Sequence, residues 1–525
     1  MTRYLINRIL RSICSVIVVV GIVMVMIYSA LDRNLIFAAD SNYTHVKSNA
    51  KEVYMMQQWE KYGYLDYVPY GDYLKELLRD DAITQETYNE AIKFANKPEQ
   101  DSEVVAQYVA QFTEKYESEG YTVVRLNGKM RGNTKRYQDG GEPRLYAYKD
   151  IPVPMRLVNY FRDLVTVDNV NYVLDDIPDR GLEFTWYDPV YGGEKFSPAI
   201  IGTGTQYKYL VYFNDKFPYF HQNLVKINLG LSYSVRQGID VFTTMTESQG
   251  SNVYSTVTYP SGAVQESADD LHTLSYASGS LESGTPVIKA NFVDDYTNVS
   301  PIKAGMSRIG YSFTMGIIAV LLSYFLAIPL GIGMALRKEK LLDKLGTVYI
   351  VFITAVPSLA YIFLFKSLGG SLGLPTTFDM ENPTWLMYVL PVISLALPSI
   401  ANLMKWLRRY MIDQMNSDYV KFARSGGLSE RQIFTKHILK NAMIPIVHGI
   451  PSSVLLALTG AIITERVYVV PGVGNMLTRA ITAYDNGVIV GMVLFYAVLT
   501  VTSIILGDVL ISLVDPRISF TSKAR

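Results

Sequence analysis

Long stretches without a charged residue constrain this chain more than any other feature. Six of them occur, and each holds about 20 or more residues, which is enough for a helix to cross the roughly 30 Å hydrocarbon core of a bilayer at 1.5 Å per residue. The first is longer than a usual signal-peptide core and lacks a small-x-small cleavage pattern, so we expect a retained helix. The sequence therefore predicts an α-helical polytopic membrane protein with six transmembrane helices, at 12–31, 309–336, 345–365, 382–404, 441–464 and 486–507.

The distribution of charge predicts how the chain is oriented. Residues 31–300 carry 25 Lys and Arg against 37 Asp and Glu, although the whole chain has a formal net charge of zero. The remaining Lys and Arg gather between the second and third stretches, between the fourth and fifth, and after the sixth. Because connections rich in Lys and Arg stay in the cytoplasm, we expect cytoplasmic N- and C-termini and a large extracellular segment between the first two helices.

The inserted segment has the pattern of a mixed α+β domain. Residues 72–97 and 103–120 show helical periodicity, whereas 121–126, 207–213 and 252–259 are rich in Val, Tyr and Thr and indicate strands. Most of the 39 tyrosines lie here, and they either form a contact face or pack the interior. The single cysteine, Cys14, cannot form a disulfide within the chain. We expect three parts: residues 1–31 (N-terminus and first helix), 32–305 (inserted extracellular domain) and 306–525 (helices two to six).

The connection between the fourth and fifth helices, residues 405–440, has its own predicted structure. Asn416, Ser417 and Asp418 offer helix N-cap chemistry, and Gly426 with Gly427 can end the short helix that follows. Ser429 with Gln432 matches a capping box, which predicts a second helix. A helix, a glycine turn and a second helix against the membrane can form a rigid contact for a cytoplasmic partner, although such turns are also common without that role.

This connection resembles a known family motif. Residues 418–431 (DYVKFARSGGLSER) and 436–445 (KHILKNAMIP) are similar to the EAA loop of binding-protein-dependent ABC importers, in the version found in the dipeptide/oligopeptide permease family. The resemblance implies that residues 419–428 form a coupling helix that docks in a groove of an ATPase subunit. The sequence departs from the family at Lys421, Phe422 and His437. The coupling residues that the resemblance implies are Asp418, Tyr419, Ala423, Arg424, Gly427, Leu428 and Ser429.

Other segments extend the resemblance. Residues 465–474 (ERVYVVPGVG) are similar to the segment that follows the fifth helix in the family, and Gly507 with Asp508 and residues 515–518 (DPRI) are similar to its C-terminal signature. The similarity covers residues 1–31, roughly 217–245, and 306–525. The position and size of the insertion resemble the oligopeptide permease subunits of streptococci and their relatives. The implied architecture is an ABC importer type I permease with an inserted extracellular α+β domain.

The resemblance also implies partners and a location. The sequence contains no G-x-x-x-x-G-K-[ST] phosphate loop, so we expect no enzyme activity and no cofactor in this chain, with ATP and Mg bound by a partner ATPase. The implied partners are a second homologous permease subunit, two cytoplasmic ABC ATPase subunits, an extracellular lipid-anchored peptide-binding protein, an oligopeptide substrate and membrane lipid, without nucleic acid. The location would be the bacterial plasma membrane.

An alternative is a membrane receptor or sensor whose extracellular domain binds peptide. A sensor of this kind needs a cytoplasmic output domain, yet no expected cytoplasmic segment exceeds about 40 residues, which is small for an independent domain. A secondary carrier is a third class, but neither coupling-ion sites nor internal repeats are visible. The five histidines show no metal-ligand spacing.

Charges at membrane depth are functional candidates. Glu465 and Arg466 are expected at the external end of the fifth helix, where they either anchor the helix at the interface or line the mouth of a pathway. Asp508 lies inside the last apolar stretch, about two turns from its cytoplasmic exit. It either pairs with a partner helix or an ATPase arginine, or holds a structural position at the interface.

Overall fold

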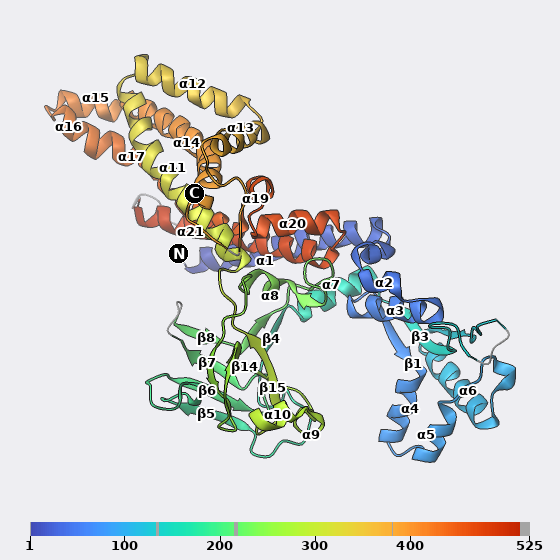
Figure 1. The fold of residues 1–525 in the computed structure, drawn as a ribbon. Coiled ribbons are helices and arrows are strands. Elements are labelled where there is room, and N and C mark those ends of the chain that lie inside the picture. Colours follow the sequence, from blue (N-terminus) through green and yellow to red (C-terminus); the bar gives the residue numbers. More distant parts are fainter. Residues whose placement is uncertain (1, 133–135, 215–218, 381, 515–525) are drawn as a thin grey trace.

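The structure of this protein is a computed structural model, described here for residues 2–132, 136–214, 219–380 and 382–514 (Figure 1). A bundle of long apolar helices carries an inserted segment that forms two lobes. Figure 1 shows the bundle above both lobes, with the first lobe in blue and the second in green. The C-terminal signature expected at 515–518 lies outside the described residues.

Four uninterrupted helices and one composite stretch are long and apolar enough to cross a membrane. The composite stretch, 430–459, follows the loop after α14 and consists of short helical elements; Pro451 stands in the first turn of α18, and Pro445 lies inside α17. A buried core of small and sulfur-containing side chains, including Met315, Ala319 and Ala327, joins α11 to α14. The uninterrupted helices are α1 (Thr2–Ala30), α11 (Arg308–Leu336), α14 (Leu386–Met415) and α21 (Asn486–Val514).

The third expected span is not one straight helix. It consists of α12 (Leu341–Ala355) and α13 (Ser358–Ser371), whose axes are bent by 108°. Pro357 stands at the break, where its missing N–H and fixed φ prevent the helix from continuing. The stretch 345–365, expected as one span, is therefore broken at Pro357. Within the described residues five helices are long and apolar enough to cross a membrane, or up to six if the bent pair counts as one span.

The composite stretch begins in the loop and ends near a second group of short helices. Its elements are α16 (Glu430–Ile433), the π-helix η4 (Phe434–Leu439), α17 (Lys440–His448), α18 (Ile450–Leu456) and the 3-10 helix η5 (Ala457–Thr459). Two more helices follow before α21: α19 (Ile462–Tyr468) and α20 (Val473–Thr482).

The first lobe packs five helices on a small antiparallel sheet of order β1-β3-β2. Its core contains Tyr70, Leu74, Phe112 and Ala147. The expected helix at 72–97 is divided, because Asp81 takes φ +55° and a turn separates α4 from α5. The elements are η1 (Arg33–Ala39), α2 (Ser41–His45), α3 (Ser48–Lys61), β1 (Leu65–Pro69), α4 (Tyr70–Arg79), α5 (Gln85–Ala91), η2 (Pro98–Gln100), α6 (Glu103–Ser118), β2 (Thr122–Leu126) and β3 (Arg144–Asp150).

The second lobe is mainly strands, as the sequence predicted for 207–213 and 252–259. Its largest sheet has the order β5-β6-β7-β8, with smaller antiparallel pairs beside it. Its elements are α7 (Val153–Arg162), β4 (Val165–Val167), β5 (Gly181–Thr185), η3 (Pro189–Tyr191), β6 (Ala199–Thr203), β7 (Tyr209–Phe213), β8 (Phe220–Gln222), β9 (Val225–Ile227), β10 (Leu231–Ser232), β11 (Ile239–Asp240), α8 (Val241–Thr246), β12 (Ser255–Thr258), β13 (Val264–Ser267), β14 (Asp269–Tyr276), α9 (Ser280–Ser283), α10 (Pro286–Asn291) and β15 (Tyr296–Pro301).

Many tyrosines of the inserted segment pack its interior. In the first lobe Tyr70 and Tyr146 are 1% and 2% exposed, and in the second lobe Tyr296 is 2% exposed. Burial of the aromatic ring removes apolar area from water, and the hydroxyl group finds a partner, as Tyr296 does with the Thr205 carbonyl at 2.7 Å. These tyrosines therefore pack the interior of the lobes and do not form a contact face.

The inserted segment is fastened to the beginning of α21. The buried Asp485 carboxylate accepts hydrogen bonds from the Ser232 hydroxyl at 2.9 Å, the Tyr233 N–H at 3.1 Å and the Ser234 N–H at 2.8 Å. Gly487 lies against the same strand, and a Cβ added there would stand 2.0 Å from the Leu231 carbonyl oxygen. Only glycine permits this approach, so the second lobe and α21 are packed backbone to backbone.

Candidate coupling site

The connection between α14 and α17 is a compact two-helix unit. It contains α15 (Asp418–Ser425), a glycine turn and α16. Gly427 takes φ +81°, a left-handed conformation that suits glycine, and the predicted capping box of Ser429 and Gln432 is present. Ser417 precedes α15 but caps nothing with its side chain, because its hydroxyl donates to the Gln414 carbonyl at 2.6 Å instead.

The inner side of the unit is packed on the bundle. Val420 and Ile433 are fully buried and Ala423 is 9% exposed, in a cluster that includes Met411 and Ala442. The resemblance implies a coupling role for Ala423, and in this structure Ala423 faces the protein's own interior. Its small side chain lets α15 lie close to α14 and α17.

Tyr419 joins the unit to three neighbouring elements. Its hydroxyl donates to the Gln414 side chain of α14 and to the His437 carbonyl at 3.3 Å, and it accepts from the Asn441 amide at 2.9 Å. The His437 ring also lies 6.4 Å from the Tyr419 ring. These contacts hold the first helix of the unit against the beginning of the fifth span.

Two ion pairs stiffen the exposed side. Arg424 donates from Nε and Nη2 to both carboxylate oxygens of Glu430, at 2.7 and 3.1 Å, and so closes the glycine turn. The hydrogen bond raises the pKa of Arg424. Within α15, Lys421 donates to Asp418 at 2.9 Å, and this bond lowers the pKa of Asp418. Both pairs are exposed to solvent, where an ion pair adds little to stability. Their role is to fix the shape of the unit.

An apolar tip remains exposed beyond these pairs. Phe422 is 80% exposed and Leu428 is 40% exposed, and nothing lies within 4 Å of the position that a Gly427 Cβ would take. Phe422 was not among the coupling residues expected from the sequence. The sequence signal that could have identified Phe422 is its departure from the family pattern. An aromatic side chain on the exposed side of a short polar helix can be buried only in a partner.

The helix before the unit, α14, is connected to the third expected span. Arg408 of α14 makes two hydrogen bonds to the buried Asp343 of α12, at 2.5 and 2.7 Å. Asp343 also accepts from the Glu339 N–H at 2.9 Å. The unit packs on α14, and the Arg408–Asp343 pair links α14 to α12 through a charged contact.

The membrane-depth charges have partners inside the chain. Glu465 is fully buried and accepts from the Ser312 hydroxyl at 2.7 Å, the Asn475 N–H at 2.9 Å and the Ala461 N–H at 3.1 Å. Glu465 therefore lies inside the protein, where its hydrogen bonds organise the turn between α19 and α20 against α11. Arg466 is exposed beside it.

Asp508 pairs with the first helix. Its carboxylate lies 2.7 Å from the Arg8 guanidinium of α1, and its side chain is 16% exposed. Of the two expected roles, this pairing within the chain fits a structural position for Asp508. The pair fastens α1 to α21 near the ends that carry the termini.

The site holds no group of side chains suited to a metal. Among the residues that the structure describes, no three His, Cys, Asp or Glu side chains gather in a way that could bind one. The loop is suited to binding another protein, because it presents an apolar tip and exposed charges on a rigid two-helix unit.

Comparison with known proteins matches this geometry. The family model described as "Binding-protein-dependent transport system inner membrane component" matches residues 327–520. The "Oligopeptide transport system permease protein AmiC" of Streptococcus pneumoniae is 34% identical over 529 residues, which cover 100% of this chain and 99% of that protein. The "Dipeptide transport system permease protein DppB" of Lactococcus lactis subsp. cremoris is 32% identical over 225 residues, 42% of this chain and 73% of its own length.

A solved structure is also similar over part of the chain. The crystal structure of an amino acid ABC transporter with histidines covers 39% of this chain at 18% identity, with a TM-score of 0.29. The full-length match to the pneumococcal protein includes the inserted segment, whereas the match to the lactococcal protein involves less than half of this chain.

Proposed function

Because the chain belongs to the family of binding-protein-dependent transport system inner membrane components, we propose that it is a permease subunit of an ATP-driven importer of oligopeptides. The full-length similarity to an oligopeptide permease supports the substrate class. In this role the chain forms half of the translocation pathway, and a second homologous permease forms the other half.

The observation that carries the mechanism is the stiff two-helix unit after α14. Its inner side is buried, Tyr419 and the Arg424–Glu430 pair fix its shape, and Phe422 and Leu428 protrude. Such an element transmits force because its parts cannot move independently. We assign it to a cytoplasmic ATPase, one of two that bind ATP and Mg, and this chain then needs no cofactor of its own.

The remaining assignments rest on charge and on the family. Lys and Arg flank the proposed coupling unit, which supports cytoplasmic termini and an extracellular position for residues 32–305. We count the bent α12–α13 pair as one span, which gives six, and retain the parts 1–31, 32–305 and 306–525. A lipid-anchored peptide-binding protein would deliver the substrate outside the plasma membrane, in contact with the inserted segment.

The test is to remove the apolar tip. Replacing Phe422 by Glu should abolish peptide uptake and lower the amount of ATPase that co-purifies, because a carboxylate cannot be buried in an apolar groove without a partner. Leu372 at the end of α13 is the matched control, since it is also 80% exposed but lies far from the unit. Leu372→Glu should keep the ATPase bound. Retention of the ATPase by Phe422→Glu, with normal uptake, contradicts the proposed coupling.

A further inference from the structure

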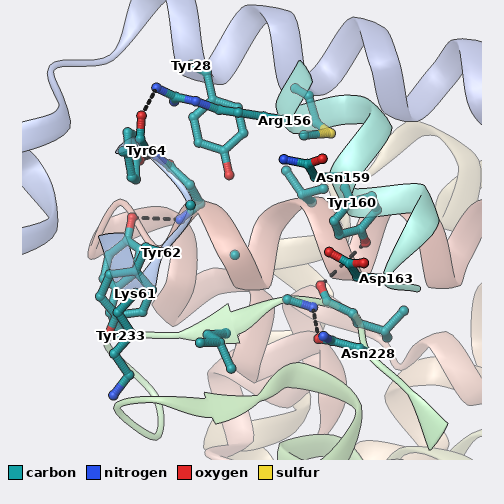
Figure 2. Close-up of a pocket in the computed structure, with 18 residues that line it drawn as sticks. Tyr28, Lys61, Tyr62, Tyr64, Arg156, Asn159, Tyr160, Asp163, Asn228 and Tyr233 are labelled. Atoms are coloured by element: carbon teal, nitrogen blue, oxygen red, sulfur yellow. Dashed lines mark hydrogen bonds between the residues drawn. The ribbon is translucent and has the colours of Figure 1, made fainter. Parts of the chain in front are cut away.

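Helix α7 has the opposite polarity from a helix that faces water. Arg156, Asn159 and Asp163 are on the side that lines a partly open pocket of about 240 Å³ (Figure 2). On the outer side, Met155 and Val158 are 53% and 59% exposed. Arg162 in the last turn is also exposed on this side, with its guanidinium 2.8 Å from the Asp163 carboxylate. A helix at a water surface turns its polar side outward. The outward apolar side of α7 therefore needs an apolar environment.

The polar side of α7 is turned toward the protein, with Arg156 and Tyr160 hydrogen-bonded inside it and Asp163 half-exposed at its end. Arg156 donates to the Ile151 and Tyr64 carbonyls at 2.7 and 2.9 Å, and its guanidinium lies over the Tyr28 and Tyr64 rings, 5.2 and 4.6 Å from their centres. Tyr160 donates to the Leu229 carbonyl at 3.4 Å. Figure 2 shows Tyr28 of α1 above this pocket, with Arg156 beside it. The inverted polarity is thus built into the packing of the helix.

The depth of α7 follows from its contact with α1. Leu157 packs on Gly21, at 3.4 Å from the position of a Gly21 Cβ. Gly21 lies nine residues before Ala30, the end of α1, which corresponds to about 14 Å along the helix. Helices that lie in a membrane interface are buried about 5–10 Å into the boundary between head groups and acyl chains. Leu157 is therefore level with the apolar part of α1.

The neighbouring surface of α1 identifies what covers α7. At 100° per residue, Val18, Ile22 and Val25 lie on one side of Gly21, and they are 58%, 55% and 51% exposed. Val20 and Met24 lie on the other side of Gly21 and are buried toward α21. The contact with α7 lies between these two sides. The outward side of α7 thus continues the exposed apolar surface of a membrane-spanning helix.

We propose that α7 lies in the membrane, with Met155 and Val158 in contact with the lipid acyl chains of the leaflet that faces the inserted segment. The helix anchors the second lobe to the bilayer and separates the polar pocket from lipid. This assignment goes beyond the transport function and does not depend on which side of the membrane the inserted segment occupies.

Spin-label accessibility tests the proposal in the full-length chain. In a Cys14→Ser background, single cysteines replace Pro154, Met155 or Val158, and nitroxide labels are attached after assembly in vesicles of phosphatidylethanolamine and phosphatidylglycerol. Collisions with oxygen and with a water-soluble nickel chelate are compared. Val18→Cys is the lipid control, and Leu174→Cys, at a 94% exposed position of the second lobe, is the water control.

Contact with lipid predicts that oxygen accessibility exceeds nickel accessibility at Met155 and Val158, as at Val18, and that the ratio is reversed at Leu174. Nickel accessibility like that of Leu174 overturns the proposal, because α7 then faces water. Low accessibility to both reagents also overturns it, because a protein partner then covers the helix. The label at Pro154 gives the same comparison from a third position on this side.

Discussion

Asp485 shows how much one residue can hold together. Its carboxylate binds four donor groups of the inserted segment and also caps its own helix, since the Val488 N–H donates to it at 3.2 Å. Next to it, the Asn486 N–H donates to the Tyr233 hydroxyl at 2.7 Å. A fully buried carboxylate in such a network is stable only because every contact supplies a donor.

Replacing Asp485 by Asn should loosen the second lobe. The amide places an N–H₂ group where N–H and O–H donors already point, and loss of hydrogen bonds to a charged group costs about 2–3 kcal/mol. A loss of about 2 kcal/mol raises the detached population roughly 30-fold. Limited proteolysis of the lobe measures this population. Asp413→Asn, at an exposed position of α14, should leave the cleavage rate unchanged. Equal rates for both variants contradict this role of Asp485.

His272 is a second buried charge-bearing residue, in the core of the second lobe. Its Nε2 lies 2.9 Å from Asp188 and its Nδ1 lies 3.3 Å from Asp270, while Tyr212 stacks on the ring at 4.2 Å. Tyr191 and Tyr209 also face the ring. Burial alone lowers a histidine pKa, but the hydrogen bonds to Asp188 and Asp270 outweigh it, so the pKa of His272 is raised.

The second lobe should therefore lose stability as the pH rises. A pKa raised by folding stabilises the protein fully below the unfolded value, about 6.5, and this contribution is lost as the pH rises through the folded pKa. His272→Gln should remove this pH dependence. The proteolysis rate between pH 5.5 and 9 measures the effect, and His45→Gln, at an exposed position of the first lobe, should keep it. A wild-type rate that falls as the pH rises contradicts the sign.

At the scale of elements, the two-helix unit was predictable from local chemistry. The capping box and the turn at Gly427 follow from residues close in sequence, and both are present in the structure, whereas the expected N-cap before α15 forms no side-chain hydrogen bond. The orientation of Ala423 was not predictable in this way. Which side of a short helix is buried depends on α14 and α17, and the motif alone does not contain that information.

Replacement of Gly427 should impair coupling because of its backbone conformation, not because a larger side chain lacks room. An alanine there keeps the volume small but must adopt φ +81°, which costs about 1–2 kcal/mol for an L-residue. Gly427→Ala should lower peptide-stimulated ATP hydrolysis by the reconstituted importer several-fold. Gly426→Ala is the matched control, because Gly426 has φ −76° and room for a Cβ. Equal activity of the two variants would falsify a conformational role for Gly427.

Breaks within elements were harder to predict than the elements themselves. Pro357 was visible in the sequence, yet prolines also occur inside α11 and α14 without dividing them. A bend of 108° therefore depends on how the pair packs in the bundle, not on the proline alone. The turn at Asp81 is similar, since an aspartate with positive φ is uncommon and leaves no clear pattern.

At the scale of the whole molecule, the apolar stretches predicted the bundle, and the alternating patterns predicted an α+β insertion. The contacts that join the two were not predictable. Ser232 and Asp485 are 253 positions apart, as are Tyr233 and Asn486, and each pair becomes visible only when the chain is folded. The same reason applies to Arg8 and Asp508, which pair although they lie near opposite ends of the chain.

The glycine contact at the beginning of α21 has a consequence for motion. Leu231 and Gly487 touch through their main chains, so no flexible side chain lies between them to absorb a displacement. A tilt of the final helix during a transport cycle should swing the second lobe by the same angle. A fluorophore on that lobe could then follow the cycle from outside the bilayer.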